Sequence, residues 1–134
     1  MDPAGVVTKP SGAGPAETLE RLDAAIRARG MTVFARIDHA AGAREAGLSL
    51  RPTTVVIFGN AVAGTPLMQA AQTIGIDLPL RGLVWQDAAG ATFVSFNDPA
   101  WLAARHGLDP AAKPQVAAMT AALHAVTDAA VAAA

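Results

Sequence analysis

The chain has 134 residues, of which 52% are hydrophobic and 16% are charged, and its formal net charge is −1. This composition predicts an ordered globule over residues 1–134 as one domain and excludes a disordered chain. The near-neutral charge without a basic stripe argues against nucleic acid as a partner, and the lack of cysteine excludes disulfides and thiolate metal sites.

Residues 1–5 lack the basic start of a signal peptide, and no charge-free apolar run is long enough to span a membrane. We therefore expect a soluble, cytoplasmic protein that has no membrane partner.

The first part of the chain alternates between strand and helix patterns. Leu22 and Ile26 recur at helical spacing, and Gly30 is typical of a helix end. Residues 53–59 are almost wholly apolar, as in a strand that is buried on both faces. The predicted elements are a strand at 5–9, a helix at 15–29, a strand at 31–38, a short helical turn at 39–46, a brief strand at 48–50 and a strand at 53–59.

The second part of the chain predicts a hairpin between helices. Thr65 can cap a helix that has Pro66 at its first position and ends at Gly75. Apolar residues from Val116 to Ala130 recur in steps of three and four, which predicts a helix with one apolar stripe. The predicted elements are a loop at 60–65, a helix at 65–75, strands at 82–87 and 91–96, a short helix at 99–106 and a last helix at 114–133.

The resulting order is β-α-β-β-β-α-β-β-α-α. A strand–helix–strand opening followed by short connections favours an α+β fold. We expect a mainly antiparallel, curved sheet of about five or six strands with the long helices on one face.

Polar side chains follow three of the predicted strands, where each strand ends. Asp38 and His39 follow the strand 31–38, Asn60 follows 53–59, and Asp98 follows 91–96. On a chain with so few charges, this placement predicts one shared site at one rim of the sheet. Neither a nucleophile elbow nor a phosphate loop is complete, and no HxH or HxxxH spacing occurs, so we assign no catalytic residue, metal or cofactor.

The two candidates that precede the predicted strand 53–59, His39 and Arg51, each have alternative roles. His39 is a ligand contact, a metal ligand or a general base, or it lies in the first turn of a helix that Asp38 caps. Arg51 holds a carboxylate or phosphate with its guanidinium, or it forms a salt bridge to Asp38 or Asp98.

The later candidates also have structural alternatives. Asn60 and Thr65 flank a glycine-containing loop whose following helix offers free N–H groups to an anion, or they form a turn and a cap. Asp98 precedes a proline at a first helical position, which is typical of a helix cap. Arg105 and His106 are expected to end that helix, and His124 is expected to be solvated.

Five segments occur in an order that is found in a known family: FARIDHAAGA (34–43), LRPTTVVIFGN (50–60), AGTPLM (63–68), LPLRGLVWQD (78–87) and FNDPAWLAARHGL (96–108). Together they resemble the bacterial and archaeal domain of unknown function 302 family (DUF 302) over about residues 5–108. The resemblance implies a fold like that of the TATA-binding protein, with a curved antiparallel sheet and helices on one side, and it implies no reaction. Ala61 departs from the family pattern, where proline often follows Gly-Asn, and the helix 114–133 lies outside the resemblance.

Three functions compete. We rank first a module that binds a small anionic or polar ligand in a cleft at the strand ends. A homodimer or other assembly formed through a sheet edge or helix face ranks second, and an acid–base enzyme that uses His39 ranks third. The ligand-binding residues expected for the first function are Asp38, His39, Arg51, Asn60, Thr65 and Asp98.

Overall fold

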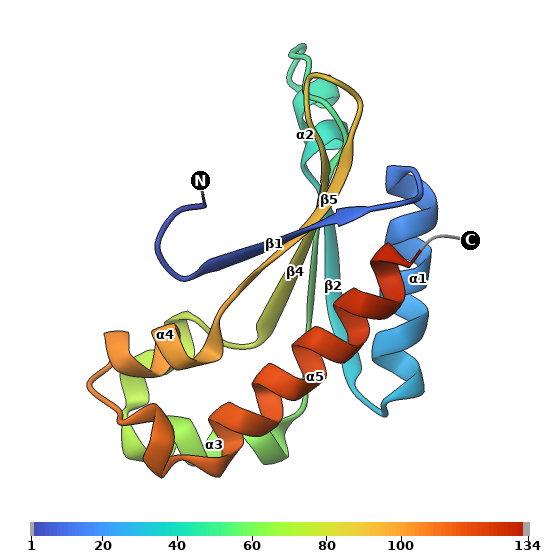
Figure 1. Cartoon of the computed structure of the whole chain (residues 1–134). Helices are drawn as coiled ribbons and strands as arrows, with labels where there is room; N and C mark the ends of the chain where they lie inside the picture. Colours follow the sequence, from blue (N-terminus) through green and yellow to red (C-terminus); the bar gives the residue numbers. More distant parts are fainter. Residues whose placement is uncertain (1, 133–134) are drawn as a thin grey trace.

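A computed structural model describes residues 2–132 and forms one five-stranded sheet with its helices (Figure 1). The strands are β1 (Val6–Ser11), β2 (Thr32–Asp38), β3 (Thr53–Gly59), β4 (Leu80–Gln86) and β5 (Thr92–Asn97). The helices are α1 (Pro15–Ala28), α2 (His39–Glu45), α3 (Ala61–Ala70), α4 (Pro99–Arg105) and α5 (Pro114–Val131), with 3-10 turns η1 (Gln72–Ile76) and η2 (Pro110–Ala112).

The sheet has the strand order β1-β5-β4-β3-β2, and each of its neighbouring pairs is antiparallel. This confirms the predicted α+β fold and antiparallel sheet. The predicted strand at 48–50 does not form. Leu48 and Leu50 are 67% and 47% exposed, and a lone segment without a neighbour for its backbone groups gains no ladder hydrogen bonds.

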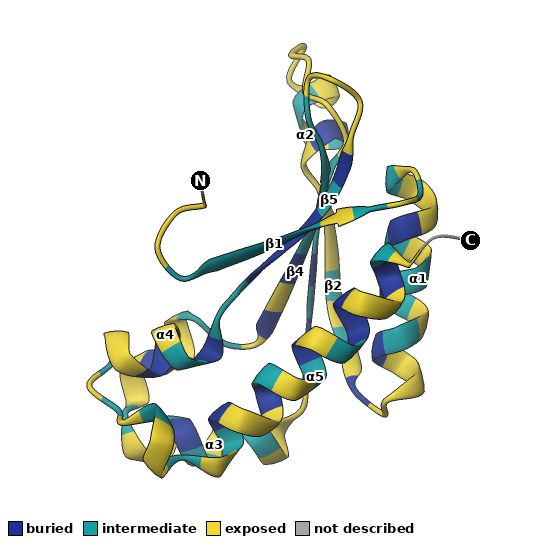
Figure 2. Cartoon of the chain, in the orientation of Figure 1, coloured by how far each residue is buried: buried dark blue, intermediate teal, exposed yellow. Residues whose placement is uncertain are grey.

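Helices α1 and α5 cover one face of the sheet, as predicted for the long helices. Leu22 and Ile26 of α1 and Leu123 and Val126 of α5 are fully buried there. Figure 2 shows this burial along the sides of α1 and α5 that face inward. The spacing of these apolar residues therefore determines which side of each helix packs on the sheet.

Gly82 of β4 allows α1 to approach the sheet closely. A Cβ atom at Gly82 would lie 3.2 Å from Cδ2 of Leu22 and 3.6 Å from Cε1 of Phe58. Both contacts are with core side chains, so a larger residue would push α1 outward or displace Phe58.

The remaining helices lie at the two ends of the sheet rather than on its face. Helix α2 and the β4–β5 hairpin are at one end, and α3 and α4 are at the other (Figure 1). The last predicted helix residue, Ala133, lies outside the described residues. None of the helices within residues 2–132 has the length and apolarity required to cross a membrane.

The start of α3 differs from the prediction. Asn60 rather than Thr65 is the cap, and the Asn60 side-chain oxygen accepts a hydrogen bond from Ala63 N at 2.9 Å. Pro66 consequently lies inside the helix. Pro66 has no N–H to donate to the carbonyl of Val62, four residues earlier, and Val62 is 86% exposed as a residue. The helix ends at Ala70 instead of Gly75, and η1 follows.

Candidate functional site

The polar residues at the strand ends do not form one site. Asp38 pairs with Thr54 in the β2–β3 ladder, whereas Gly59 pairs with Thr32. The C-terminal ends of these two antiparallel strands are therefore at opposite ends of the sheet. The expectation of a single rim is wrong, because it conflicts with the antiparallel pairing that was itself expected for most of the sheet.

Asp38, His39 and Arg51 belong to the end of the sheet that carries α2. The Asp38 carboxylate accepts a hydrogen bond from Ala41 N at 2.9 Å and caps α2, where His39 is an exposed first residue. Arg51 donates from Nε to the backbone oxygen of Gln86 at 3.3 Å. Within residues 2–132, the ion pairs do not include the expected salt bridge from Arg51 to an aspartate.

A hollow of about 330 Å³ lies at this end, between the start of α1 and the β2–α2 junction. Its polar lining comes from Asp38, Arg44 and Thr54, and its apolar lining includes Leu19 and Val84. Asp38 already accepts the capping hydrogen bond. His39 and Arg51 do not line this hollow, so their predicted ligand contacts stay predictions without a common cavity.

Asn60, Thr65 and Asp98 belong to the opposite end. The Asp98 carboxylate accepts a hydrogen bond from Ala100 N at 3.0 Å and caps α4, as the structural alternative predicted. Asp98 does not line the cavity there. Asn60 and Thr65 do, so the structure places two of the six predicted residues in one pocket.

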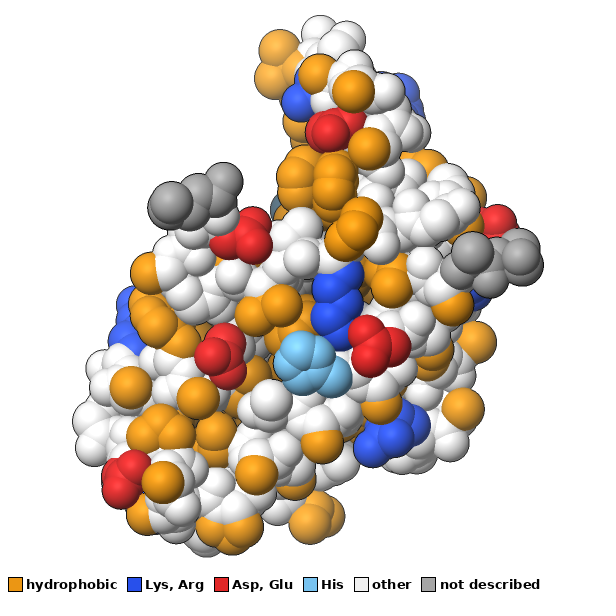
Figure 3. Space-filling view, viewed as in Figure 1, with side chains coloured by type: hydrophobic (Ala, Val, Ile, Leu, Met, Phe, Trp, Pro, Cys, Tyr) orange, Lys and Arg blue, Asp and Glu red, His pale blue; other side chains and the backbone are white. Residues whose placement is uncertain are grey.

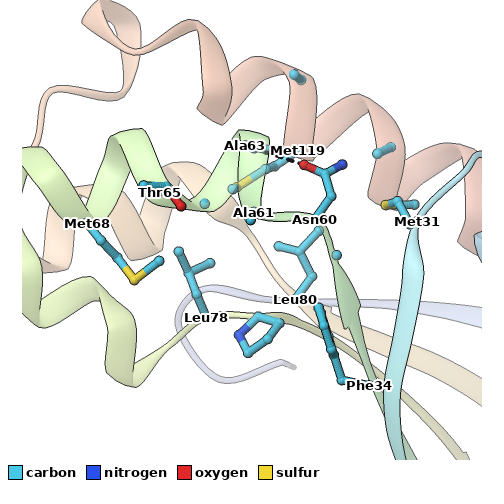
Figure 4. A pocket seen from close by; sticks show the side chains of 15 residues that line it. Met31, Phe34, Asn60, Ala61, Ala63, Thr65, Met68, Leu78, Leu80 and Met119 are labelled. Atoms are coloured by element: carbon cyan, nitrogen blue, oxygen red, sulfur yellow. Dashed lines mark hydrogen bonds between the residues drawn. The ribbon is translucent and has the colours of Figure 1, made fainter.

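This pocket has a volume of about 310 Å³ and lies where α3, α5 and the ends of three strands meet (Figure 4). Its lining is mainly apolar and includes three methionines, which are side chains that adapt to irregular shapes. The lining residues are Met31, Phe34, Gly59, Asn60, Ala61, Ala63, Gly64, Thr65, Met68, Leu78, Pro79, Leu80, Ala118, Met119 and Ala122.

The polar side chains of the pocket are Asn60 and Thr65. The Asn60 oxygen is engaged by Ala63 N, which leaves the side-chain amide nitrogen of Asn60 as a donor. The pocket also includes the first residue of α3, whose N-terminal N–H groups and dipole favour an acceptor or an anion. An apolar lining with a few convergent donors is typical of a small-molecule site.

A partly buried polar cluster beside this pocket was not predicted from the sequence. His106 Nε2 lies 2.6 Å from a carboxylate oxygen of Asp77, and His106 Nδ1 lies 2.9 Å from the Thr73 hydroxyl. Arg105 Nη1 also donates to Asp77 at 2.9 Å. The cluster joins η1 to α4 and anchors the residue that precedes Leu78 and Pro79 in the pocket wall. The sequence contained no local signal for it, because its two halves are about thirty residues apart.

His124 is exposed, as expected, and it belongs to a second polar cluster on the surface of the protein. Lys9 Nζ donates to Asp128 at 2.7 Å and to Thr127 at 2.9 Å, and it lies 3.0 Å from Nδ1 of His124. The His124 ring also packs edge-on against Phe96. These contacts join β1 to α5. Elsewhere on this side of the described chain, charged side chains are scattered among hydrophobic and neutral ones (Figure 3).

The described part of the chain has no cluster of side chains that is suitable for binding a metal ion. Residues 2–132 contain no group of three or more His, Cys, Asp or Glu side chains placed to hold one ion.

Two relatives have been given a name that refers to ion transport. The chain is 49% identical over 124 residues to the "Fluoride-specific ion channel FluC 1" of Brucella suis biovar 1 (strain 1330), which covers 92% of this chain and 49% of that protein. The corresponding protein of Brucella abortus biovar 1 (strain 9-941) has the same identity over 92% of this chain and 46% of its own length. The chain thus spans about half the length of these relatives.

A similar solved structure and a matching family model both point to the same protein family. A crystal structure of an uncharacterised conserved DUF302 protein from Bacillus stearothermophilus has a TM-score of 0.83 and 24% identity, over 96% of this chain and 99% of that one. The model for the family "Domain of unknown function DUF302" matches residues 7–126. That match extends beyond residue 108 and includes most of α5, which the sequence resemblance had left outside. The chain therefore belongs to the DUF302 family.

Proposed function

We propose that this chain is a binding module for a small amphiphilic molecule, which it holds in the pocket between α3, α5 and the strand ends. The observation that carries the proposal is the 310 Å³ cavity with its apolar lining and its few donors. Its size is at the lower end of the range for small-molecule sites, roughly 300–1,000 Å³.

The proposed ligand has an apolar body and one acceptor group. Met68, Leu78 and Met119 provide an adaptable apolar wall for the body. The Asn60 amide nitrogen and the start of α3 provide donors for the acceptor. This revises the polar or anionic ligand expected from the sequence, since Asp38, His39 and Arg51 do not reach this pocket.

A pocket-filling variant tests the proposal. Ala118 is exposed on α5 and lines the pocket, so Ala118→Trp should occupy the cavity without disturbing the buried side of the helix. Ala121 is exposed on the same helix and does not line the pocket, so Ala121→Trp is the matched control.

The probe is 8-anilinonaphthalene-1-sulfonate, which combines apolar rings with one anionic group. We expect its fluorescence to rise on binding to the wild type and to Ala121→Trp, with at least about a tenfold weaker Kd for Ala118→Trp, because the two tryptophans differ only in whether they enter the cavity. Equal affinities in the three proteins, or no binding to the wild type, would reject the proposal. A thermal-shift screen of small carboxylic acids would then identify the class of ligand.

The names of the Brucella relatives favour a second role, which concerns fluoride transport in the cell and not ligand binding in the pocket. We propose that the chain acts beside a fluoride-transport system, because two proteins named as fluoride-specific ion channels share 49% identity with it over 124 residues. Deletion of the coding sequence in its source organism should lower the fluoride concentration at which the cells still grow. The wild-type sequence supplied on a plasmid should restore growth, and an unchanged tolerance in the deletion strain would rule out this role.

A further inference from the structure

We propose that the uncovered face of the sheet is a homodimer interface, on which a second copy of this chain packs. This open face consists of the strand side chains that point away from α1 and α5. Its centre runs across the register Ile37–Val55–Leu83–Ser95. The neighbouring strand residues that point the other way, such as Val56 and Val84, are buried under the helices.

The open face is mainly apolar, and the Asp2 carboxylate lies against the Thr8 hydroxyl, from which it accepts a hydrogen bond at 2.9 Å. Val55, Ile57, Leu83, Trp85 and Phe93 are only half-buried in the isolated chain. Arg81 is the one charged side chain among the strand residues whose register places them on this face. Apolar surface with depleted charge is characteristic of the core of a homodimer interface.

The hydroxyl groups of Thr53 and Ser95 and the indole N–H of Trp85 on the open face already have hydrogen-bond partners within the chain. The Ser95 hydroxyl accepts a hydrogen bond from Trp85 Nε1 at 2.9 Å and pairs with the Thr8 hydroxyl at 2.7 Å. The Thr53 hydroxyl donates to the backbone oxygen of Arg51 at 2.8 Å. An identical apolar face can therefore cover these groups without leaving a buried donor or acceptor unpaired.

The area of the open face is close to that of the smaller specific interfaces. Strands of about six residues, spaced about 4.8 Å apart with a rise of about 3.4 Å per residue, give a five-stranded plane of roughly 480 Å². Two such faces bury roughly 960 Å² as flat planes, which is slightly below the total of about 1,000 Å² for a specific interface, and the relief of the side chains adds to this area.

The face is also complementary to itself. Arg81 lies toward one end of β4, and Trp85 lies toward the other end, where it stacks on Phe93 with ring centroids 4.9 Å apart. A two-fold axis that crosses the strands at Leu83 stacks β4 on β4 with opposite strand directions. Each Arg81 then lies over the aromatic pair of the other copy as a cation–π contact. With parallel strands, the two arginines would meet and repel each other.

Sedimentation velocity from about 1 µM to about 300 µM tests the proposal, since interfaces at the lower end of the size range are weak and dissociate at micromolar concentrations. We expect the wild type to dimerise in this range. Leu83→Glu at the centre of the face should raise the dimer Kd at least about a hundredfold, because two unpaired carboxylates are buried. Arg81→Ala should raise it about fivefold to thirtyfold, because two cation–π contacts are lost.

Val62→Glu is the matched control, because Val62 is an 86% exposed residue of α3 that lies away from this face. The dimer Kd of this variant should equal that of the wild type. If Leu83→Glu fails to fold by circular dichroism, Ile37→Glu replaces it, because Ile37 is 44% exposed in the isolated chain. A wild type that stays monomeric throughout, or a dimer that the folded variant of the face leaves unchanged, would overturn the proposal.

Discussion

Removal of the Asp77 carboxylate is the most direct test of how the pocket wall is anchored. Asp77→Ala takes away the acceptor of His106 Nε2 and of Arg105 Nη1. The Asp77 carboxylate accepts, so Nε2 of His106 is the donor in that contact, and Nδ1 pairs with the Thr73 hydroxyl. The substitution therefore leaves an N–H donor without its acceptor.

The expected loss of stability follows from burial. The His106 side chain is 8% exposed and that of Asp77 is 15% exposed, so the unpaired N–H lies largely away from water. A buried donor that loses its acceptor costs about 1–3 kcal/mol. At about 2 kcal/mol, and with about 3 °C of Tm per kcal/mol for a chain of this length, Asp77→Ala should lower the Tm by about 6 °C.

The assay is thermal and urea unfolding followed by circular dichroism, with Arg105→Ala as the matched control. The Arg105 side chain is 51% exposed, so loss of its ion pair should cost less than about 1 kcal/mol. Asp77→Ala should also weaken dye binding, because Asp77 directly precedes Leu78 and Pro79 of the pocket wall. The reasoning is refuted if Asp77→Ala unfolds like the wild type, or if Arg105→Ala costs as much as Asp77→Ala.

The other predictions concern two glycines and one cap. Gly82→Ala should cost about 1–3 kcal/mol in urea unfolding, because its Cβ would lie 3.2 Å from Leu22 Cδ2. Gly64→Ala in α3 should instead be neutral or stabilise by up to about 1 kcal/mol, since its Cβ would meet nothing closer than 3.7 Å. If both variants unfolded alike, the packing argument would be wrong. Asn60→Ala should cost about 1 kcal/mol by loss of the α3 cap, and Asn60→Asp should restore stability; a cost that Asp does not recover would contradict the capping role.

Local sequence patterns predicted most of the secondary structure. The apolar spacing from Val116 to Ala130 corresponds to the buried side of α5, and Pro99 behind Asp98 marks the start of α4. These elements depend on residues within one or two turns of each other, whose preferences can be read directly. The start of α3 was mispredicted, because Asn60 and Thr65 are both good caps and Pro66 is typical of a first helical position.

The candidate site could be predicted only in part. Asn60 and Thr65 were identified from glycine, proline and cap signals, and both line the pocket. The apolar residues that make up most of its lining were not identified, because they come from separate segments, and each has the composition of an ordinary core residue. Asp77 and His106 were likewise missed, since their contact crosses between η1 and α4.

By itself, the sequence determined most of the elements, the fold class and the family, since periodicity, caps and motifs are short-range features of the chain. Only the tertiary structure decided which strand ends face each other. The antiparallel pairing of β2 with β3 places Asp38 and Asn60 at opposite ends of the sheet. Which strands pair depends on contacts between residues that are distant in the sequence, and these contacts are not visible in local patterns. The pairing therefore places the residues of the expected site at two opposite ends of the sheet, and the pocket forms at one of these ends.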